Sequence, residues 1–301
     1  MSVTTQATHT PSVIATLATG GAKEDLRTLL FSLSVFNASP PKIYLYCDDE
    51  IKRLLPTFKY PGKILTSTVE LNKYSGLNRQ QMERMRGRRF PSLWFDFMAE
   101  KIFLLKWAFA EEGKAAATTG VLFCDADICF FAPLPAIPAG AAVALSHHEI
   151  RAVDEALYGR YNGGFAWLSD PRYADAWLAA CDAGQRFFEQ SALEDVAAAA
   201  TAEGPQALYE FPRTQNFGWW RLWQGEKGYE ELQREWTMNR RKDPAASGIL
   251  VRGELLGSVH THFSEQKDVA TLRYNAWVVA WLERLASSHA PARRLLAHLK
   301  R

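Results

Sequence analysis

Two patterns of hydrophobic and polar positions alternate along the first half of the chain. Short apolar runs at 13–19, 43–47 and 121–124 are typical of strands buried on both faces of a sheet. Between them, apolar residues recur every three or four positions over 26–36 and 97–109, which is typical of helices with one buried face. Strands that alternate with helices at this spacing predict an α/β fold around a parallel sheet.

The second half of the chain repeats these patterns less regularly. They predict strands at about 63–71, 141–146, 164–168 and 250–262, helices over 174–202 and 274–301, and a helix break at Pro291. The stretch 211–225 is rich in Trp and Arg and is predicted to be a loop. Because the sequence shows neither an internal repeat nor a long linker, we expect a single domain over residues 1–301.

Composition and charge exclude several classes of protein. Hydrophobic residues make up 48% of the 301 residues, and the formal net charge is +2, which excludes a disordered chain and argues against a dedicated nucleic-acid binder. The four cysteines form no C-x-x-C pair and predict reduced thiols. The sequence shows no signal-peptide pattern and no apolar run long enough to span a membrane. We therefore expect a cytoplasmic protein.

The strongest candidate for chemistry is Asp125-Ala126-Asp127, which follows the apolar run 121–124. Open α/β sheets bind their ligands at the carboxyl ends of the strands. Two neighbouring carboxylates repel each other unless a cation lies between them, and hard oxygen ligands suit Mg²⁺ or Mn²⁺. The alternative is an acidic turn that caps the strand.

The segment VLFCDADICFFAPLP resembles the D-x-D segment of GT-A glycosyltransferases, which use nucleotide-sugar donors. Four other segments resemble motifs of that superfamily in the same order: the Lys-bearing helix DFMAEKIFLLKWAF, Tyr161-Asn162-Gly163-Gly164-Phe165, Glu203-Gly204-Pro205-Gln206-Ala207-Leu208 as a D-Q-x-x-L segment, and Val259-His260-Thr261-His262-Phe263. The likeness covers most of residues 13–267. It implies a GT-A type, Rossmann-like mixed sheet that is mostly parallel. It also implies a nucleotide-binding half at about 13–135, an acceptor-binding half at about 136–270 and a C-terminal helical tail at about 271–301.

The resemblance also implies a metal site. Asp127 would bind the ion directly, and Asp125 would contact the donor ribose and the ion. His262 or His260 would be the other protein ligand, with His262 preferred because it lies nearer Lys267. The two histidines of an H-x-H segment share one face of a strand. This spacing fits metal binding, and it also fits two histidines that only form hydrogen bonds. An imidazole ligand favours Mn²⁺ over Mg²⁺.

Catalytic and donor-binding residues follow from the same resemblance. Glu203 would be the base of an inverting enzyme, Gln206 would face the anomeric carbon in a retaining enzyme, and Asn162 would bond the donor hydroxyls; the stereochemistry stays open. The remaining donor-binding candidates are Thr16, Ala18, Thr19, Asp48, Lys101, Asp125, Ala126, Gly163, Gly164 and Lys267.

The implied function is a metal-dependent transfer of a sugar from a nucleotide-diphosphate donor to a glycan or lipid-linked acceptor. UDP is the favoured nucleotide because it is common in the superfamily. The alternatives are a sugar-phosphate nucleotidyltransferase, an aspartate-nucleophile phosphatase that uses Asp125, and a non-catalytic carbohydrate-binding protein. Only Gly20-Gly21 follows the first strand, without the basic loop that is typical of a nucleotidyltransferase.

Three clusters remain outside these motifs. Arginines between 79 and 89 would contact phosphate or form a solvated face, and Trp219, Trp220 and Trp223 would stack on sugar rings or belong to the core. The last residues combine five basic side chains with Leu295, Leu296 and Leu299. Such a segment predicts either contact with the inner face of an anionic membrane or an ordinary packed helix. The basic residues are Arg284, Arg293, Arg294, Lys300 and Arg301.

Overall fold

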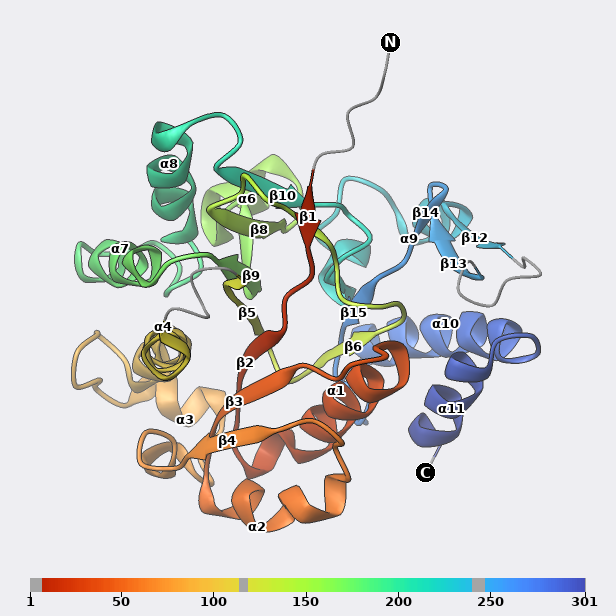
Figure 1. Cartoon of the computed structure of the whole chain (residues 1–301), viewed down its shortest axis with the longest axis horizontal. Helices are drawn as coiled ribbons and strands as arrows, with labels where there is room; N and C mark the ends of the chain where they lie inside the picture. The colour runs from red at the N-terminus through yellow and green to blue at the C-terminus, as the bar shows by residue number, and fades with distance from the viewer. Residues whose placement is uncertain (1–6, 114–118, 240–246, 301) are drawn as a thin grey trace.

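A seven-stranded sheet forms the centre of the computed structural model, which describes residues 7–113, 119–239 and 247–300 (Figure 1). The strand order is β10-β8-β9-β5-β2-β3-β4. All of these strands run in one direction except β9, which is antiparallel to β5 and β8. The expected mixed, mostly parallel sheet is therefore confirmed. The bounds are β2 (Val13–Ala18), β3 (Lys42–Cys47), β4 (Ile64–Ser67), β5 (Val121–Cys124), β8 (Val143–His147), β9 (Tyr161–Leu168) and β10 (Leu208–Phe211).

Helices cover both faces of this sheet. Residues of α1 (Lys23–Phe36) and α2 (Asp49–Phe58) form one buried cluster with alternate residues of β2. The other residues of β2 pack with α4 (Leu93–Glu112), α7 (Pro171–Asp182) and α8 (Leu193–Glu203). Successive side chains of a strand point to opposite faces, so an apolar run such as β2 is explained by helices on both sides.

A third apolar cluster lies beside the sheet, at the right of Figure 1. Two small sheets contribute to it: β11 (Phe217–Gly218), β15 (Ser258–His260) and β6 (Ile128–Phe130), and β12 (Trp236–Asn239), β13 (Gly248–Val251) and β14 (Glu254–Leu255). A separate two-stranded sheet consists of β1 (Thr8–His9) and β7 (Ile137–Pro138), and Ile137 belongs to the cluster that contains α1 and α2. The further helices are α3 (Arg79–Arg84), α6 (Ala152–Tyr158), α9 (Tyr229–Arg234), α10 (Val269–Ala286) and α11 (Ala290–Leu299).

Two predicted helices differ from the structure. The Ala-rich stretch 174–202 is not one helix, because Gly184, with φ of 95°, lies just after α7, and α8 starts only at Leu193. In the tail, Pro291 lies in the first turn of α11 and so starts a helix instead of breaking one. The division of the chain into a nucleotide-binding half, an acceptor-binding half and a tail stays a prediction.

The C-terminal leucines pack on the protein. Leu295 is fully buried, and Leu296 and Leu299 pack against the third apolar cluster, so this apolar face does not support the predicted membrane contact. Lys300 pairs with Glu283 at 2.7 Å, and Arg301 lies outside the described residues. In the described part of the chain, no helix combines the length and the apolar character that crossing a membrane requires. The four cysteines are free and buried, as predicted.

Candidate active site

Asp125 and Asp127 lie in the tight turn between β5 and β6, at the carboxyl edge of the large sheet. The Asp125 N–H donates to the carbonyl of Gly164 on β9 at 2.8 Å, and the Ile128 N–H donates back to the Asp125 carbonyl at 3.2 Å. The side chains of Asp125 and Asp127 are 25% and 13% exposed, respectively. The strand end and this turn therefore hold both carboxylates near the surface but largely out of water.

Antiparallel pairing brings two histidines to Asp127. In the register of β15 on β6, His260 lies opposite Ile128. His260 Nε2 is 3.0 Å from Asp127 Oδ1, and His262 Nε2 is 3.4 Å from Asp127 Oδ2. Both imidazoles thus face one carboxylate, although β15 ends at His260 and His262 lies beyond it.

Three of these side chains form a possible metal-binding group. The ligand atoms of Asp125, Asp127 and His260 all lie within 4.8 Å of one another. Two carboxylates and an imidazole are a donor set that suits Mn²⁺. The residues present therefore fit the divalent cation that the resemblance implies.

His262 does not belong to this group, although the sequence favoured it over His260. Its Nδ1 is 2.8 Å from Oδ2 of Asp25, in the first turn of α1. The charge of Asp127, and then the bond to Asp25, raise the pKa of His262 to about 10. The geometry therefore groups His260, and not the preferred His262, with the two carboxylates.

A chain of hydrogen bonds assigns the proton on His260. The Gly164 N–H donates to a side-chain atom of Asn162 at 3.0 Å, which identifies this atom as the oxygen, Oδ1. The same oxygen accepts a hydrogen bond from Asn216 Nδ2 at 3.0 Å. Asn216 Oδ1 is then an acceptor for His260 Nδ1 at 2.8 Å. With its hydrogen on Nδ1, a neutral His260 directs the lone pair of Nε2 toward Asp127, as metal-binding histidines do.

Lys101 of α4 lies behind the carboxylates. Its Nζ is 2.6 Å from Glu189 Oε1 and 3.7 Å from Asp125 Oδ1, and it donates to the Gly163 carbonyl at 3.1 Å. Burial lowers the pKa of Lys101, but the charges of Asp125 and Glu189 outweigh burial and raise it. Lys101 is therefore a buried cation that orients Asp125, and at 1% exposure it does not offer a surface to a donor.

Gly164 and Gly163 lie where a side chain has no room. A Cβ on Gly164 would overlap Asp125 Oδ2 and lie 2.7 Å from His260 Cε1. A Cβ on Gly163 would lie 2.8 Å from Glu189 Oε1. Asn162 and Ala126, which are 7% and 6% exposed, complete this part of the site. The two glycines thus allow the backbone of β9 to approach the side chains of Asp125 and Glu189.

The other donor-binding candidates lie in different surroundings. Thr16, Ala18 and Thr19 belong to the carboxyl end of β2, next to β5 in the sheet. Asp48 follows β3 but is fully buried, and its carboxylate accepts bonds from the Gly20 and Ile51 N–H groups and from Ser75. It therefore caps α2 and holds the loop, which corrects its expected contact with the donor. Lys267 is exposed beyond His262, and its donor role stays a prediction.

Glu203 and Gln206 are not brought to this site. They lie just before β10, which starts level with the first residue of β8 and runs parallel to it. Their place is therefore the amino edge of the sheet, opposite Asp125. Glu203 pairs with Arg172 there at 2.6 Å, and Gln206 lies beside Gly140. The expected catalytic positions are corrected because the chain reverses direction between β9 and β10.

Four neighbours of the cluster were missed by the sequence reasoning. Glu189 and Gln190 lie in the turn before α8, where Gln190 Oε1 accepts from the Gly163 N–H at 3.1 Å. Glu189-Gln190 followed by Leu193 keeps the acid-Gln-x-x-Leu spacing and fits that motif better than 203–208. Asp25 and Asn216 gave no comparable signal, since one starts a helix and the other lies in a predicted loop.

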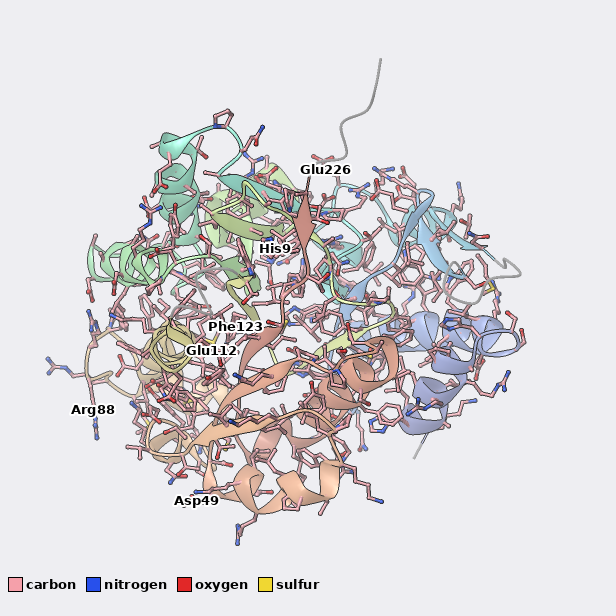
Figure 2. All side chains as sticks on the ribbon, in the orientation of Figure 1. His9, Asp49, Arg88, Glu112, Phe123 and Glu226 are labelled. Carbon is pink, nitrogen blue, oxygen red and sulfur yellow. The ribbon has the colours of Figure 1, made fainter. Side chains whose placement is uncertain are left out.

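The arginine and tryptophan clusters have mixed environments. Arg79 pairs with Glu83 and Arg89 with Asp182, and Figure 2 shows Arg88 pointing away from the molecule. Trp220 is only 7% exposed, and its ring lies 4.9 Å from that of His260. Trp220 therefore supports the metal-binding group from the core, whereas Trp223 is 39% exposed.

Comparison with solved structures places this site in a known fold. The chain is similar to the glycosyltransferase GlyE of Streptococcus pneumoniae TIGR4, with 12% identity and a TM-score of 0.50 over 93% of this chain and 64% of that one. The chain has a GT-A-like glycosyltransferase fold. It is also similar to mouse xyloside xylosyltransferase 1 (10% identity, TM-score 0.45, 84% of this chain and 98% of that one). The WbbM bifunctional glycosyltransferase has 10% identity and a TM-score of 0.49 over 85% of this chain and 46% of that one.

The chain thus spans less than two thirds of the GlyE and WbbM structures. No family model matches the sequence, and no curated protein matches it either.

Proposed function

We propose that the protein is a metal-dependent glycosyltransferase that uses a nucleotide-diphosphate sugar. The observation that carries the proposal is the group formed by Asp125, Asp127 and His260 at the carboxyl edge of β5, in a GT-A-like fold. This edge is where open α/β sheets bind nucleotides. The sugar acceptor would be a glycan or a lipid-linked molecule, and UDP is the favoured nucleotide.

The residues of the site divide into proposed metal ligands and residues that hold these ligands in place. Asp125, Asp127 and His260 would hold Mn²⁺ or Mg²⁺, which neutralises the charge of the diphosphate leaving group. Lys101 would hold Asp125 in place by its charge, and His262 would link Asp127 to Asp25. Gly163 and Gly164 let β9 lie close to Glu189 and Asp125, and Asn162 would hold this backbone by accepting from the Gly164 N–H.

The proposed donor site extends from Asp125 to the end of β2. Thr16 and Ala18 lie on that neighbouring strand and Thr19 directly follows it, where the nucleotide base would lie. Glu203 and Gln206 take no part, because they belong to the opposite edge of the sheet. We therefore assign neither a base nor a stereochemical course.

The experiment that tests the proposal is thermal unfolding of the full chain with UDP, GDP or neither, in Mn²⁺ or in EDTA. A nucleotide at 100 times its dissociation constant adds about 2.7 kcal/mol to the free energy of unfolding. For a chain of this size, that corresponds to a rise of roughly 5 °C in the melting temperature. We expect the rise only with the metal, because Asp125 and Asp127 would hold the cation whose charge attracts the diphosphate.

If the nucleotide raised the melting temperature equally in Mn²⁺ and in EDTA, the result would contradict a metal-bridged diphosphate. Two further assays separate the alternatives. Release of pyrophosphate from UTP and a sugar phosphate would identify a nucleotidyltransferase. Binding of UDP-sugars with neither transfer nor hydrolysis would identify a non-catalytic carbohydrate-binding protein.

Asn216→Ala should weaken Mn²⁺ binding by about 10- to 100-fold, as loss of a partner that orients a metal ligand typically does. The substitution removes the acceptor that keeps the hydrogen of His260 on Nδ1. Electron paramagnetic resonance of free Mn²⁺, titrated with the metal-free protein, measures the affinity directly. Asn37→Ala is the matched control, since Asn37 also holds backbone groups with its amide but lies at the end of α1. Equal affinities of Asn216→Ala and the wild type would disprove this role for Asn216.

A further inference from the structure

A cavity of about 450 Å³ lies at the carboxyl end of β8. His147, the last residue of β8, lines it, and so do Arg213, Phe217 and Arg221 from the segment 213–221. Its volume lies within the range of small-molecule sites. The same segment carries Asn216, the hydrogen-bond partner of His260, so the cavity adjoins the proposed metal site.

Three buried N–H groups of this lining have no hydrogen-bond partner among the described residues. They are Arg213 Nη1, Arg221 Nε and His147 Nδ1. Glu235 Oε2 lies 3.9 Å from Arg213 Nη1 and Glu155 Oε1 lies 3.9 Å from His147 Nδ1, so both carboxylates are beyond hydrogen-bond distance. Arg160 Nε donates to His147 Nε2 at 2.8 Å, so in the neutral imidazole the hydrogen of His147 lies on Nδ1. Buried polar groups are nearly always hydrogen-bonded. Three unpartnered donors around one cavity therefore indicate a ligand that offers acceptor oxygens.

Arg221 adds a buried positive charge to these donors. It is 3% exposed, and its Nη1 and Nη2 donate to the carbonyls of Arg213 at 2.6 Å and His147 at 3.2 Å. Within the described ranges, Arg221 has no ion pair within 4 Å, and Glu149 is the carboxylate whose charge acts on it. A buried charge is costly unless it is paired, so an anionic ligand would stabilise this arginine.

Four carboxylates line the cavity, those of Glu149, Glu155, Glu226 and Glu235, and two of them have close cationic partners. Glu149 pairs with Arg213, and Glu235 pairs with Lys227 at 2.5 Å and with Arg252 at 2.6 Å. Burial raises the pKa of Glu149, but the charges of Arg221 and Arg213 and the Arg213 hydrogen bond outweigh burial and lower it. The potential beside Glu149 is therefore positive, although acids and bases both line the cavity.

We propose that this cavity binds the sugar acceptor through an oxyanion, either a carboxylate or a phosphate group. The acceptor assignment rests on the proposed transferase function, whereas oxyanion binding does not. Guanidinium groups bind such oxygens in pairs and with favourable charge. Arg213 and Arg221 would bind the oxyanion, and His147 would donate a third hydrogen bond.

Calorimetric titration of the full chain tests the proposal with three probes at fixed ionic strength: methyl glucuronide, glucose 6-phosphate and methyl glucoside. We expect at least one anionic sugar to bind about tenfold or more tightly than the neutral glucoside. Comparing the two anionic probes distinguishes a carboxylate from a phosphate. Equal affinity for all three sugars, or no binding of either anionic sugar, would overturn the proposal.

Arg213→Gln should abolish this preference, whereas Arg172→Gln, which removes a comparable ion pair at the opposite edge of the sheet, should retain it. Glu149→Gln frees Arg213 from its partner and should keep or tighten oxyanion binding, which a merely structural role of the pair would not do. Loss of the preference in all three variants would overturn the assignment to Arg213. Melting curves with Mn²⁺ and UDP on the same samples report on the transferase function separately.

Discussion

Asp127→Asn should lower the rate of sugar transfer at least about 10³-fold while the protein stays folded. The cation supplies several kcal/mol of charge stabilisation in the transition state, and about 4 kcal/mol corresponds to that factor. Burial raises the pKa of Asp127, but the imidazoles of His260 and His262 outweigh burial and hold it below its ordinary value. Asparagine keeps the shape of the side chain but removes the charge that the metal needs.

The measurements are initial rates with a panel of UDP-sugars, Mn²⁺ affinity by paramagnetic resonance, and thermal unfolding. Asp49→Asn is the matched control, because Asp49 is an exposed aspartate at the start of α2, at the edge of the view in Figure 2. A wild-type rate for Asp127→Asn would show that Asp127 is not a ligand. If Asp127→Asn does not fold, the metal affinity of Asp125→Asn decides whether the carboxylates of this turn bind the ion.

Gly164→Ala should reduce Mn²⁺ affinity and transfer activity by at least about 100-fold. The added Cβ would overlap Asp125 Oδ2 and lie 2.7 Å from His260 Cε1, so two proposed ligands would have to move together. Displacement of reacting groups by about 1 Å is enough for an effect of this size. The change adds one methyl group and removes no charge, so it tests the geometry of the site and not its electrostatics.

Gly228→Ala is the control for this variant, since its Cβ would meet no atom within 4 Å. Mn²⁺ affinity, activity and melting temperature should be measured for both proteins. Unchanged metal affinity in Gly164→Ala would show that Asp125 and His260 do not bind one ion. A large fall in melting temperature without a change in metal affinity would assign Gly164 to folding alone.

The sequence located the large sheet and its acidic edge. Buried parallel strands are continuous apolar runs, which is why β2, β3 and β5 were predicted with nearly their observed bounds. The D-x-D segment follows one of these runs directly, so its position at the carboxyl edge depends only on local sequence. His260 ends β15, and His262 follows two residues later outside the strand, so the strand pattern alone accounts only for His260.

The Ala-rich stretch before β10 was harder to interpret. Alanine favours helix at every position, so composition could not show where the chain turns between α7 and α8. That turn carries Glu189 and Gln190 to the site, and the following helix carries Glu203 to the opposite edge of the sheet. Motif spacing alone does not show this reversal. It therefore selected Glu203 and Gln206, which lie at the opposite edge, instead of Glu189 and Gln190.

By itself, the sequence determined the strands, the helices that cover them, and the two carboxylates at a strand end, because these depend on local apolar patterns and strand direction. Only the tertiary structure decided which residues surround those carboxylates. Asp25, Lys101, Glu189 and Asn216 come from four separate segments. Their meeting depends on helix packing and on the reversal of β9, and long-range pairing of this kind leaves no periodic pattern in the sequence.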